Sequence, residues 1–377
     1  MNHLPVVFGY HINGTGNASV PYALCSHWNT AGLVSPLYGP SCDKGLDGWW
    51  VRPAMGTLRK KLVYRFGKAR APQRLVEKLA LKKEESNPFV YLWAGLSLDV
   101  FSKFKRQGKR IVLERINCHQ ATAKTILDTA YHDLRLRPDH TITEARIGEE
   151  KEKLDMADAV FCPHPQVYSS MLDNGVDEEK LLASSYGWSP DRFSALDPAP
   201  RNNVQPVFLF VGTLCVRKGV PLLLAAWDRA AIKGKLVFCG TMDATIRNNF
   251  GHYFDRPDIT HVSFTEDLGS YYNKADCFVF PSLEEGGPLV TYEAMAHGLL
   301  PLVSVMGAGA IVEHRRNGLV LGHDVDEWAT ALRAVVDNRP RSAELARAAH
   351  LQAWNFTWEK VAAGRAELLQ RKFPGLW

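Results

Sequence analysis

Short apolar, β-rich runs alternate with segments of helical spacing along almost the whole chain, and this alternation constrains the fold more than any other feature. Such an alternation is typical of a parallel sheet whose strands are joined by covering helices. The runs expected to be strands are PVVFGY, FVYLWA, RIVLE, AVFCP, VFLFVG, KLVFCG, CFVFP and LPLVSV. They predict an α/β fold.

The predicted strands fall into two sets, and the segment between them, Trp188–Pro206, is rich in Pro, Ser and Asn with little periodicity. The chain has 377 residues, which exceeds the roughly 250–300 residues at which a single core stops growing. We therefore predict two Rossmann-like, doubly wound domains that face each other across a cleft, with ligand at the carboxyl ends of the strands. The predicted boundaries are a first domain over 1–190, a linker over 191–206 and a second domain over 207–354.

Composition narrows the class of protein further. Hydrophobic residues make up 46% of the chain and aromatic residues 10%, as in ordinary globular proteins. No apolar run approaches the roughly 20 residues that span a bilayer, and the N-terminus lacks the features of a signal peptide. The seven cysteines are scattered without a CxxC pair, which favours reduced thiols over a zinc site or a disulfide framework. We expect a cytoplasmic location.

One stretch, Arg52–Lys83, concentrates positive charge: it holds eleven Lys or Arg and a single acid, Glu77, whereas the net charge of the whole chain is +5. A solvated basic face explains such a stretch without any ligand. The alternatives are attraction to an anionic membrane surface or to an anionic substrate. No zinc finger, RNP or other nucleic-acid motif accompanies the charge, so we expect no nucleic-acid partner.

The string SLEEGGPLVTYEAMAHG places two carboxylates, Glu285 and Glu293, around a predicted helix start. It follows the predicted strand CFVFP, and Pro288 suits the first helical position. The early amides of a helix attract anions, and Gly286 and Gly287 permit close backbone approach. Carboxylates on either side of an anion site match a molecule with hydroxyls at both ends and phosphates between, a nucleoside diphosphate sugar. An ordinary strand-to-helix turn with a loop acid is the alternative.

A second string, VFLFVGTLCVRKGVPLLLAAW, combines a strand, a turn at Gly212 and the cations Arg217 and Lys218 before an amphipathic helix. The turn permits close approach of a phosphate, and the cations would neutralise a leaving diphosphate. The string is not a Walker P-loop, which needs GxxxxGK followed by Ser or Thr. A solubilising Lys near a helix start is the alternative explanation.

These two strings resemble a known family, the GT-B glycosyltransferases of the retaining family 4 type. The E-x7-E string from Glu285 to Glu293 with EAMAHG is similar to the signature of that family, and FVGTLCVRKG is similar to its phosphate loop. Weaker resemblances cover ADAVFCP with the helix after it, FTEDLGSYYNKADCFVFPS and FTWEKVAAGRAELL. The last string resembles the final helix of the family, which implies that 355–377 crosses back to the first domain.

The resemblance implies a role for each matching residue. Glu293 would hold the ribose hydroxyls, Glu285 with the following amides would handle the donor sugar and phosphate, and Lys218 would contact the diphosphate. The implied donor-binding residues are Gly212, Thr213, Arg217, Lys218, Gly286, Gly287, Pro288, Leu289 and Glu293. The family often has Arg where this chain has Thr213, and the resemblance leaves open whether Arg217 supplies that charge.

The first domain carries two further resemblances. The string GYHINGTGNASVPYAL falls where the family has a Gly-rich loop on the acceptor side, which implies acceptor-side roles for Gly14, Thr15 and Gly16. His119, in LERINCHQATAK, falls near a family His that approaches the donor sugar. The implied catalytic residues are therefore Glu285, Lys218 and His119, with a structural His that caps a strand as the alternative for His119.

The motif Asp324-Val325-Asp326 has the spacing of a metal-binding DxD motif. It directly precedes the helical pattern EWATALRAVV, so a helix cap with helix-dipole acids is the simpler explanation. We expect neither a catalytic metal nor another cofactor.

The sequence thus predicts a retaining glycosyltransferase that moves a sugar from a nucleoside diphosphate sugar to a hydroxyl of a saccharide or lipid-linked acceptor, in polysaccharide or glycoconjugate biosynthesis. Because no side chain is an obvious nucleophile, the resemblance implies front-face displacement. A peripheral position at the inner face of the membrane follows if Arg52–Lys83 binds lipid. The alternatives are a nucleotide-sugar epimerase of the same fold and a catalytically silent subunit that binds sugar nucleotides.

Overall fold

The computed structural model separates into two compact units. Unit 1 consists of Met1–Gln120, Thr143–Tyr186 and Trp358–Trp377, and unit 2 consists of Ala121–Ile142 and Gly187–Thr357. The structure describes residues 3–46, 48–67, 70–93, 95–193 and 203–376. Residues 194–202 of the predicted linker, residues 68–69 of the basic stretch and Ala94 of the predicted strand FVYLWA therefore lie outside the described residues.

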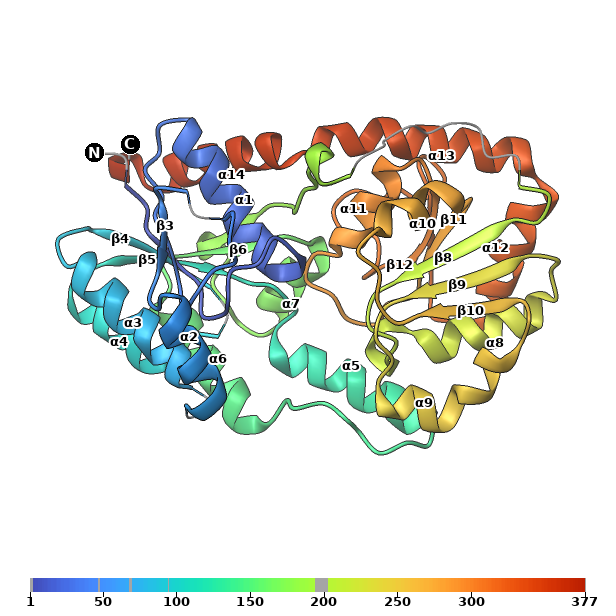
Figure 1. The fold of residues 1–377 in the computed structure, drawn as a ribbon, viewed down its shortest axis with the longest axis horizontal. Coiled ribbons are helices and arrows are strands. Elements are labelled where there is room, and N and C mark those ends of the chain that lie inside the picture. Colours follow the sequence, from blue (N-terminus) through green and yellow to red (C-terminus); the bar gives the residue numbers. More distant parts are fainter. Residues whose placement is uncertain (1–2, 47, 68–69, 94, 194–202, 377) are drawn as a thin grey trace. The chain divides into compact units, whose positions relative to one another are not determined.

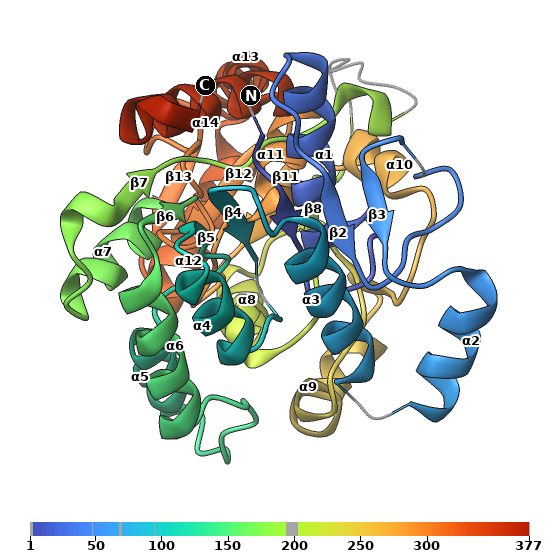
Figure 2. The same ribbon diagram turned by 90° about the vertical axis from the view of Figure 1, so that its left-hand side faces the viewer.

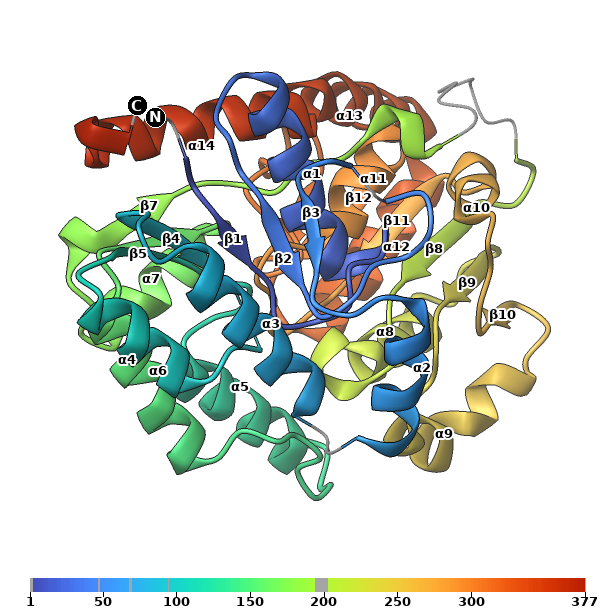
Figure 3. The same ribbon diagram turned by 60° about the vertical axis from the view of Figure 1, so that its left-hand side comes forward.

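Unit 1 is built on a parallel sheet with the strand order β3-β2-β1-β4-β5-β6-β7 among the described residues. The register pairs Val6 of β1 with Leu37 of β2 on one side and with Tyr91 of β4 on the other. Figure 3 shows β1, β2 and β3 running side by side. The strands are β1 Val6–Val7, β2 Leu37–Gly39, β3 Val51–Pro53, β4 Phe89–Leu92, β5 Arg110–Glu114, β6 Ala159–Cys162 and β7 Leu181–Ala183.

Helices cover both faces of this sheet (Figures 1 and 2): α1 and α14 lie on one face, and α3, α4 and α6 lie on the other. The C-terminal helix is held by specific contacts as well as by packing. The indole nitrogen of Trp28 in α1 donates to the carbonyl of Ala362 at 2.8 Å, and the buried Arg365 pairs with Glu114 at the end of β5 at 2.8 Å. The helices of unit 1 are α1 Gly16–Thr30, α2 Thr57–Phe66, α3 Ala71–Lys83, α4 Leu98–Arg106, α6 Glu144–Met156, α7 Pro165–Asp173 and α14 Trp358–Lys372.

Unit 2 is built on a second parallel sheet, with the order β10-β9-β8-β11-β12-β13 among the described residues. Phe208 of β8 lies opposite Leu236 of β9 and Cys277 of β11. The strands are β8 Val207–Val211, β9 Lys235–Cys239, β10 Ile259–Val262, β11 Cys277–Phe280, β12 Leu300–Ser304 and β13 Leu319–Leu321. The two parallel α/β sheets confirm the predicted fold class.

The helices of unit 2 pack in pairs, α8 with α12 and α11 with α13 (Figure 1). They are α5 Gln120–Asp133, α8 Val220–Ala230, α9 Ala244–Phe250, α10 Leu268–Lys274, α11 Leu289–Ala296, α12 Val325–Asp337 and α13 Arg339–Ala353. Two single-turn 3₁₀ helices, η2 Pro190–Arg192 and η3 Val216–Lys218, matter for the site. No described helix is both long and apolar enough to cross a membrane.

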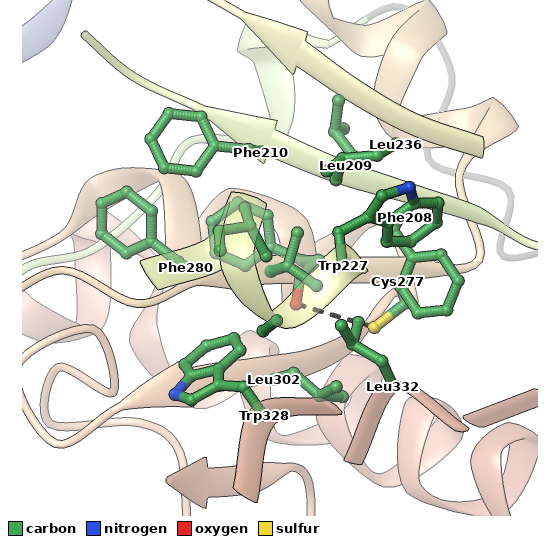
Figure 4. Packing of buried hydrophobic residues seen from close by; sticks show 14 of the residues in the cluster. Phe208, Leu209, Phe210, Trp227, Leu236, Cys277, Phe280, Leu302, Trp328 and Leu332 are labelled. Carbon is green, nitrogen blue, oxygen red and sulfur yellow. Dashed lines mark hydrogen bonds between the residues drawn. The ribbon is translucent and has the colours of Figure 1, made fainter. Parts of the chain in front are cut away.

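Large side chains fill the core of unit 2 (Figure 4). The rings of Phe208 and Trp227 meet edge to face with centroids 5.3 Å apart, and those of Phe210 and Phe280 lie 5.6 Å apart. Aromatic residues bury large areas and favour such offset geometries. The core therefore fixes where β8 and β11 end, and the loops after these two strands carry the predicted donor site.

The strand order reverses direction at one point in each sheet. In unit 1 the chain first adds β2 and β3 on one side of β1, and it then returns to place β4 on the other side of β1. In unit 2 the chain likewise adds β9 and β10 on one side of β8 and then places β11 on the other side. Loops that follow two such neighbouring strands diverge and leave a crevice at the carboxyl end of the sheet, where open α/β proteins bind ligands.

Candidate functional site

The loop between β8 and α8 is shaped by two glycines with positive φ. Gly212 follows β8 with a φ of 144°, and Gly219 ends η3 with a φ of 70°. A Cβ atom on Gly219 would lie 2.0 Å from the carbonyl oxygen of Pro281. Both the backbone conformation and this close approach require glycine, and together they bring η3 against the loop that follows β11.

Lys218 of η3 and Glu285 of the β11–α11 loop form a buried ion pair between Nζ and Oε1. The exposed fractions of the two side chains are 13% and 8%. The Ser282 hydroxyl donates to the same carboxylate oxygen at 2.8 Å. The structure therefore brings together two residues that the sequence analysis placed at a diphosphate, although they lie 67 positions apart in the chain.

Burial and charge oppose each other in this pair. Burial raises the pKa of Glu285, but the charges of Lys218 and Arg217 and the bonds from Lys218 and Ser282 outweigh it, so the pKa lies below its ordinary value. Burial lowers the pKa of Lys218, and the attraction of Glu285 offsets only part of that effect. The carboxylate is thus held ionised beside its cation.

Arg217 points to the residue before Glu285. Its Nη1 lies 3.2 Å from the carbonyl oxygen and 3.4 Å from Oε2 of Glu284. Its own carbonyl accepts from the amide of Leu283 at 2.8 Å. Thr213, where the family often has Arg, is exposed. Two cations on η3, Arg217 and Lys218, therefore stand beside the β11–α11 loop.

The start of α11 differs by one position from the expectation. Pro288 is the N-cap and Leu289 the first helical residue, whereas the sequence analysis placed Pro288 inside the first turn. Pro288 contributes no side-chain hydrogen bond to the helix, and Gly286 before it is buried. The positive end of a helix without a side-chain cap attracts anions. Lys218 and Arg217 add full charges next to it.

Glu293 lies inside α11 and is 3% exposed. One carboxylate oxygen pairs with Nη1 of Arg192 in η2, and the other accepts from the Tyr272 hydroxyl at 3.1 Å. Burial raises the pKa of Glu293, and Arg192 and Tyr272 offset part of the effect. The carboxylate is therefore held in one orientation from two sides, and each of its oxygens keeps a lone pair that can accept a further hydrogen bond.

Ser282, Arg192 and Tyr272 were missed by the sequence analysis. Ser282 could have been found, because it stands within the quoted SLEEGG string and small hydroxyl residues often bond to nearby carboxylates in loops. Arg192 and Tyr272 reach Glu293 across 101 and 21 positions of the chain. No local spacing indicates such contacts, which depend on the folding of unit 2.

The remaining predicted residues lie in unit 1. His119 immediately precedes α5 and is 4% exposed, with Nε2 3.4 Å from Oε2 of Glu150. Burial lowers its pKa more than the charge of Glu150 raises it. Gly14, Thr15 and Gly16 lead into α1, where Thr15 is the N-cap and Gly16 has a φ of 53°. Their predicted roles at the acceptor and the donor sugar stay predictions.

The DxD motif forms a helix cap, as expected. The carboxylate of Asp324 accepts from the amide of Glu327 at 2.8 Å, and Asp326 pairs with Arg229 at 2.7 Å. In the described part of the chain, no group of three or more His, Cys, Asp or Glu side chains is arranged to hold a metal ion.

The arrangement in unit 2 can bind a molecule that carries negative charge between two hydroxyl-bearing ends. Lys218, Arg217 and the start of α11 offer positive charge in the middle, and the fixed carboxylates Glu285 and Glu293 offer acceptors on either side. Charge-assisted hydrogen bonds to fixed carboxylates are about twice as strong as neutral ones.

Comparison with known proteins relates part of the chain to a described family. Residues 205–338 match the family model described as Glycosyl transferases group 1. A D-inositol 3-phosphate glycosyltransferase 2 from Catenulispora acidiphila is 28% identical over 257 residues, which cover 62% of this chain and 60% of that protein. The matches with the curated relatives span about half to three fifths of those proteins' length.

Solved structures match over nearly the whole chain. Sucrose-phosphate synthase from Thermosynechococcus elongatus has a TM-score of 0.75 and 20% identity, covering 99% of this chain and all of that chain. The Anabaena protein HepE in complex with UDP-glucose has a TM-score of 0.66 and 13% identity, covering 98% and 99%. At such identities the likeness shows the fold alone. Residues 205–338 are thus similar to the glycosyl transferases group 1 family, and the chain as a whole has the GT-B fold of these solved structures.

Proposed function

We propose that the protein is a retaining glycosyltransferase that moves a sugar from a nucleoside diphosphate sugar to a hydroxyl of a saccharide or lipid-linked acceptor. The observation that carries the proposal is the buried Lys218–Glu285 pair beside the start of α11. A buried ion pair costs more desolvation than it returns in many proteins. A pair in the loops after β8 and β11, where the strand order of unit 2 reverses, and next to a second cation, is therefore better explained by binding of a charged substrate than by stability.

The diphosphate is proposed to lie between η3 and the first turn of α11. Cleavage of the donor C1–O bond places negative charge on the β-phosphate, so Lys218, Arg217 and the helix amides interact more strongly with the transition state than with the bound donor. The departing phosphate accepts the proton of the acceptor hydroxyl as that hydroxyl enters on the same face of the sugar. The described residues then supply orientation and charge, and no covalent intermediate is needed.

Glu293 is proposed to hold the ribose. A carboxylate accepts from both hydroxyls of a vicinal diol, and Arg192 and Tyr272 keep this one in place. A uracil nucleotide is the first donor to test, because the structural neighbour HepE was solved with UDP-glucose. Glu285 is proposed to face the donor sugar, since its partner Lys218 faces the diphosphate.

The α2 part of the basic stretch is proposed to dock on an anionic membrane surface. Leu62 and Phe66 of α2 are exposed by 55% and 74%, and Arg65 lies over the ring of Phe66 at 5.2 Å. Exposed apolar side chains among Lys and Arg are typical of helices that lie in the interface of an anionic bilayer. Such a position would bring the protein to a lipid-linked acceptor at the inner face of the membrane.

A panel of nucleoside diphosphate sugars, incubated with the purified protein and followed by NMR, tests the proposed activity. Slow hydrolysis or transfer that releases free nucleoside diphosphate from one donor is the expected result. A new nucleotide sugar formed without any acceptor would instead identify an epimerase. Binding of a donor without turnover on water or on any acceptor would identify a silent subunit.

A further inference from the structure

Two adjoining cavities lie in unit 1, the larger at the carboxyl ends of β1, β4 and β5 and the smaller between α3 and α4. Their volumes are about 410 and 370 Å³, and they share Arg70, Gln73 and Ser97 in their walls. Tyr10 follows β1 and Trp93 follows β4, and both line the larger cavity. The larger cavity therefore occupies the point where the strand order of unit 1 reverses, the same position that the candidate donor site has in unit 2.

The larger cavity has the lining expected for a hydroxyl-rich ligand. Tyr10 is 56% exposed and offers an aromatic face, and Gln120 and Arg115 offer polar groups. Trp93 is 1% exposed, and its indole N–H has no hydrogen-bond partner among the described residues. A buried donor of this kind normally has a partner. Because Trp93 lines the cavity, a ligand hydroxyl is a natural acceptor for it after a small movement of the ring.

Hydrogen bonds hold polar groups in the walls of both cavities. Glu77 is buried and accepts from the side chain of Gln73 at 3.0 Å and from the amide of Ser97 at 2.6 Å. Lys153 donates to the carbonyl of Leu96 at 2.7 Å and to Glu149 at 2.6 Å. Polar groups fixed by such bonds lose little freedom when a ligand binds.

The charge of the two linings is positive, with seven Lys or Arg against five Asp or Glu. Four of the acids are bound to cations outside α3, in the pairs Asp99–Lys103, Glu149–Lys153, Glu150–Arg115 and Glu114–Arg365. The fifth acid, Glu77, accepts from Gln73 and Ser97. The remaining lining cations are Arg146 on α6 and Arg70, Arg74 and Lys78 on α3 and its N-cap, so most of the excess positive charge lies on α3 and its N-cap.

Arg70, Arg74 and Lys78 lie four residues apart on one face of α3 and its N-cap. All three line the smaller cavity and are exposed, and none has a salt bridge to a described residue. Side chains spaced by four residues are neighbours on a helix surface. No large hydrophobic side chain of α3 is exposed, in contrast to α2. The basic stretch thus contains two different surfaces.

We propose that the two cavities bind an acceptor that carries a phosphate group on a sugar or other polyol. The phosphate lies on Arg70, Arg74 and Lys78, and the hydroxyls face the larger cavity. This assignment of the acceptor rests on the proposed transferase function. Arg binds phosphate through two parallel hydrogen bonds, which neutral hydroxyls do not match.

Ligand-observed NMR or calorimetry on the full chain tests the proposal. The probes are hexose 6-phosphates and inositol phosphates, each paired with its neutral parent. A phosphorylated probe should bind about tenfold or more tightly than its parent, and the double variant Arg74→Gln/Lys78→Gln should lose that preference. Lys61→Gln, on α2 and outside both cavities, is the matched control and should keep it.

A second arm distinguishes a lipid headgroup from a soluble ligand. Vesicles of phosphatidylinositol and of phosphatidylserine are compared at equal net charge. The site would be assigned to the lipid headgroup if the protein binds phosphatidylinositol vesicles more tightly than phosphatidylserine vesicles. The double variant Arg74→Gln/Lys78→Gln should then lose this preference, and Lys61→Gln should keep it. The proposal would be overturned if phosphorylated and neutral probes bind equally in solution and both kinds of vesicle also bind equally. A preference for the phosphorylated probe or for phosphatidylinositol that persists in the double variant would overturn it too. Binding of UDP, measured on the same samples, reports on the donor site separately.

Discussion

Lys218 is the residue on which the proposed chemistry depends most. Its ammonium group is held against Glu285, at the place proposed for the leaving diphosphate. We expect Lys218→Ala to lower kcat by about two to three orders of magnitude, with a smaller rise in donor KM, since one preorganised stabilising group is removed. Steady-state kinetics on the donor found in the nucleotide-sugar panel measure both constants.

Two comparisons control this experiment. Lys233→Ala removes an exposed cation of unit 2 and should leave kcat unchanged. Arg217→Ala should lose activity comparable to Lys218→Ala if Arg217 supplies the charge that Thr213 does not carry. Because removal of Lys218 leaves Glu285 buried without its cation, unfolding curves must show that the variant is folded. A folded Lys218→Ala protein with near-normal kcat would contradict the assigned phosphate site.

Glu293→Gln tests the ribose contact. The variant keeps the shape of the side chain but weakens the hydrogen bonds to ribose and to Arg192, so UDP should bind more weakly by about 1–3 kcal/mol. Isothermal titration calorimetry measures the difference, with Glu367→Gln on α14 as a control. Unchanged affinity would remove Glu293 from the site.

The pH dependence of the difference in UDP affinity between the wild-type protein and Glu293→Gln is a second test of the ribose contact. Because burial raises the pKa of Glu293, the group binds a proton at a higher pH than an ordinary Glu as the pH falls. The advantage of the wild-type protein over Glu293→Gln should therefore shrink as the pH is lowered from neutrality through the raised pKa. The comparison cancels the titration of UDP itself, which both proteins experience.

At the scale of single residues, the sequence singled out three residues that the fold brings into the candidate site, but not the residues that contact them. Glu285, Lys218 and Glu293 stand in short strings whose spacing indicates their chemistry. Arg192 stands within the predicted linker and meets Glu293 only in the folded unit. Contacts of that kind depend on packing, and one sequence does not encode them in any local pattern.

Among the elements, the junction between η3 and α8 depends on one glycine. Gly219 has a φ of 70°, and an added Cβ would lie 2.0 Å from the carbonyl oxygen of Pro281. Gly219→Ala should lower the free energy of unfolding by more than about 1 kcal/mol, because it combines an unfavourable backbone conformation with a backbone clash. Urea denaturation measures the loss. Gly251→Ala is the control, since Gly251 has a φ of −55° and open space at the Cβ position.

The proposed membrane contact of α2 predicts a salt-sensitive interaction. Binding to acidic vesicles should be strong at low salt and fade as ionic strength rises, with a loss of about 1 kcal/mol for each engaged cation that is removed. Arg65→Gln should weaken vesicle binding because it removes a positive charge. Phe66→Ser should weaken it because the bilayer then buries less apolar surface. Lys151→Gln, an exposed cation on α6, should change nothing. Vesicle sedimentation that shows no binding, or binding independent of salt, would return α2 to a simple solvated face.

The eight strands predicted from apolar runs are all present in the structure, whereas β2, β3, β7, β10 and β13 were not predicted. Four of these five form the edges of the two sheets among the described residues. Edge strands are short and paired on one side, so they need no long apolar run. β3, with the sequence VRP, buries only its first residue. The central strands carry the continuous apolar runs that sequence reasoning detects.

At the scale of the whole chain, each unit places its candidate site at the reversal of strand order in its own sheet. The sequence predicted the two doubly wound sheets, because the alternation of strands and helices determines that architecture. It did not indicate the cavities of unit 1, since their walls combine residues from β1 through α6. The basic stretch was visible in the sequence, but only the fold separates its exposed apolar helix from its cavity-lining helix.

The stereochemistry of the first product tests the central claim most directly. An α-linked nucleoside diphosphate sugar, incubated with the protein and followed by NMR before mutarotation, should release or transfer the sugar as the α-anomer, and Lys218→Ala should slow this reaction. Release of the β-anomer first would contradict front-face displacement at this site. Turnover that is unchanged in a folded Lys218→Ala protein would contradict the proposed role of the Lys218–Glu285 pair.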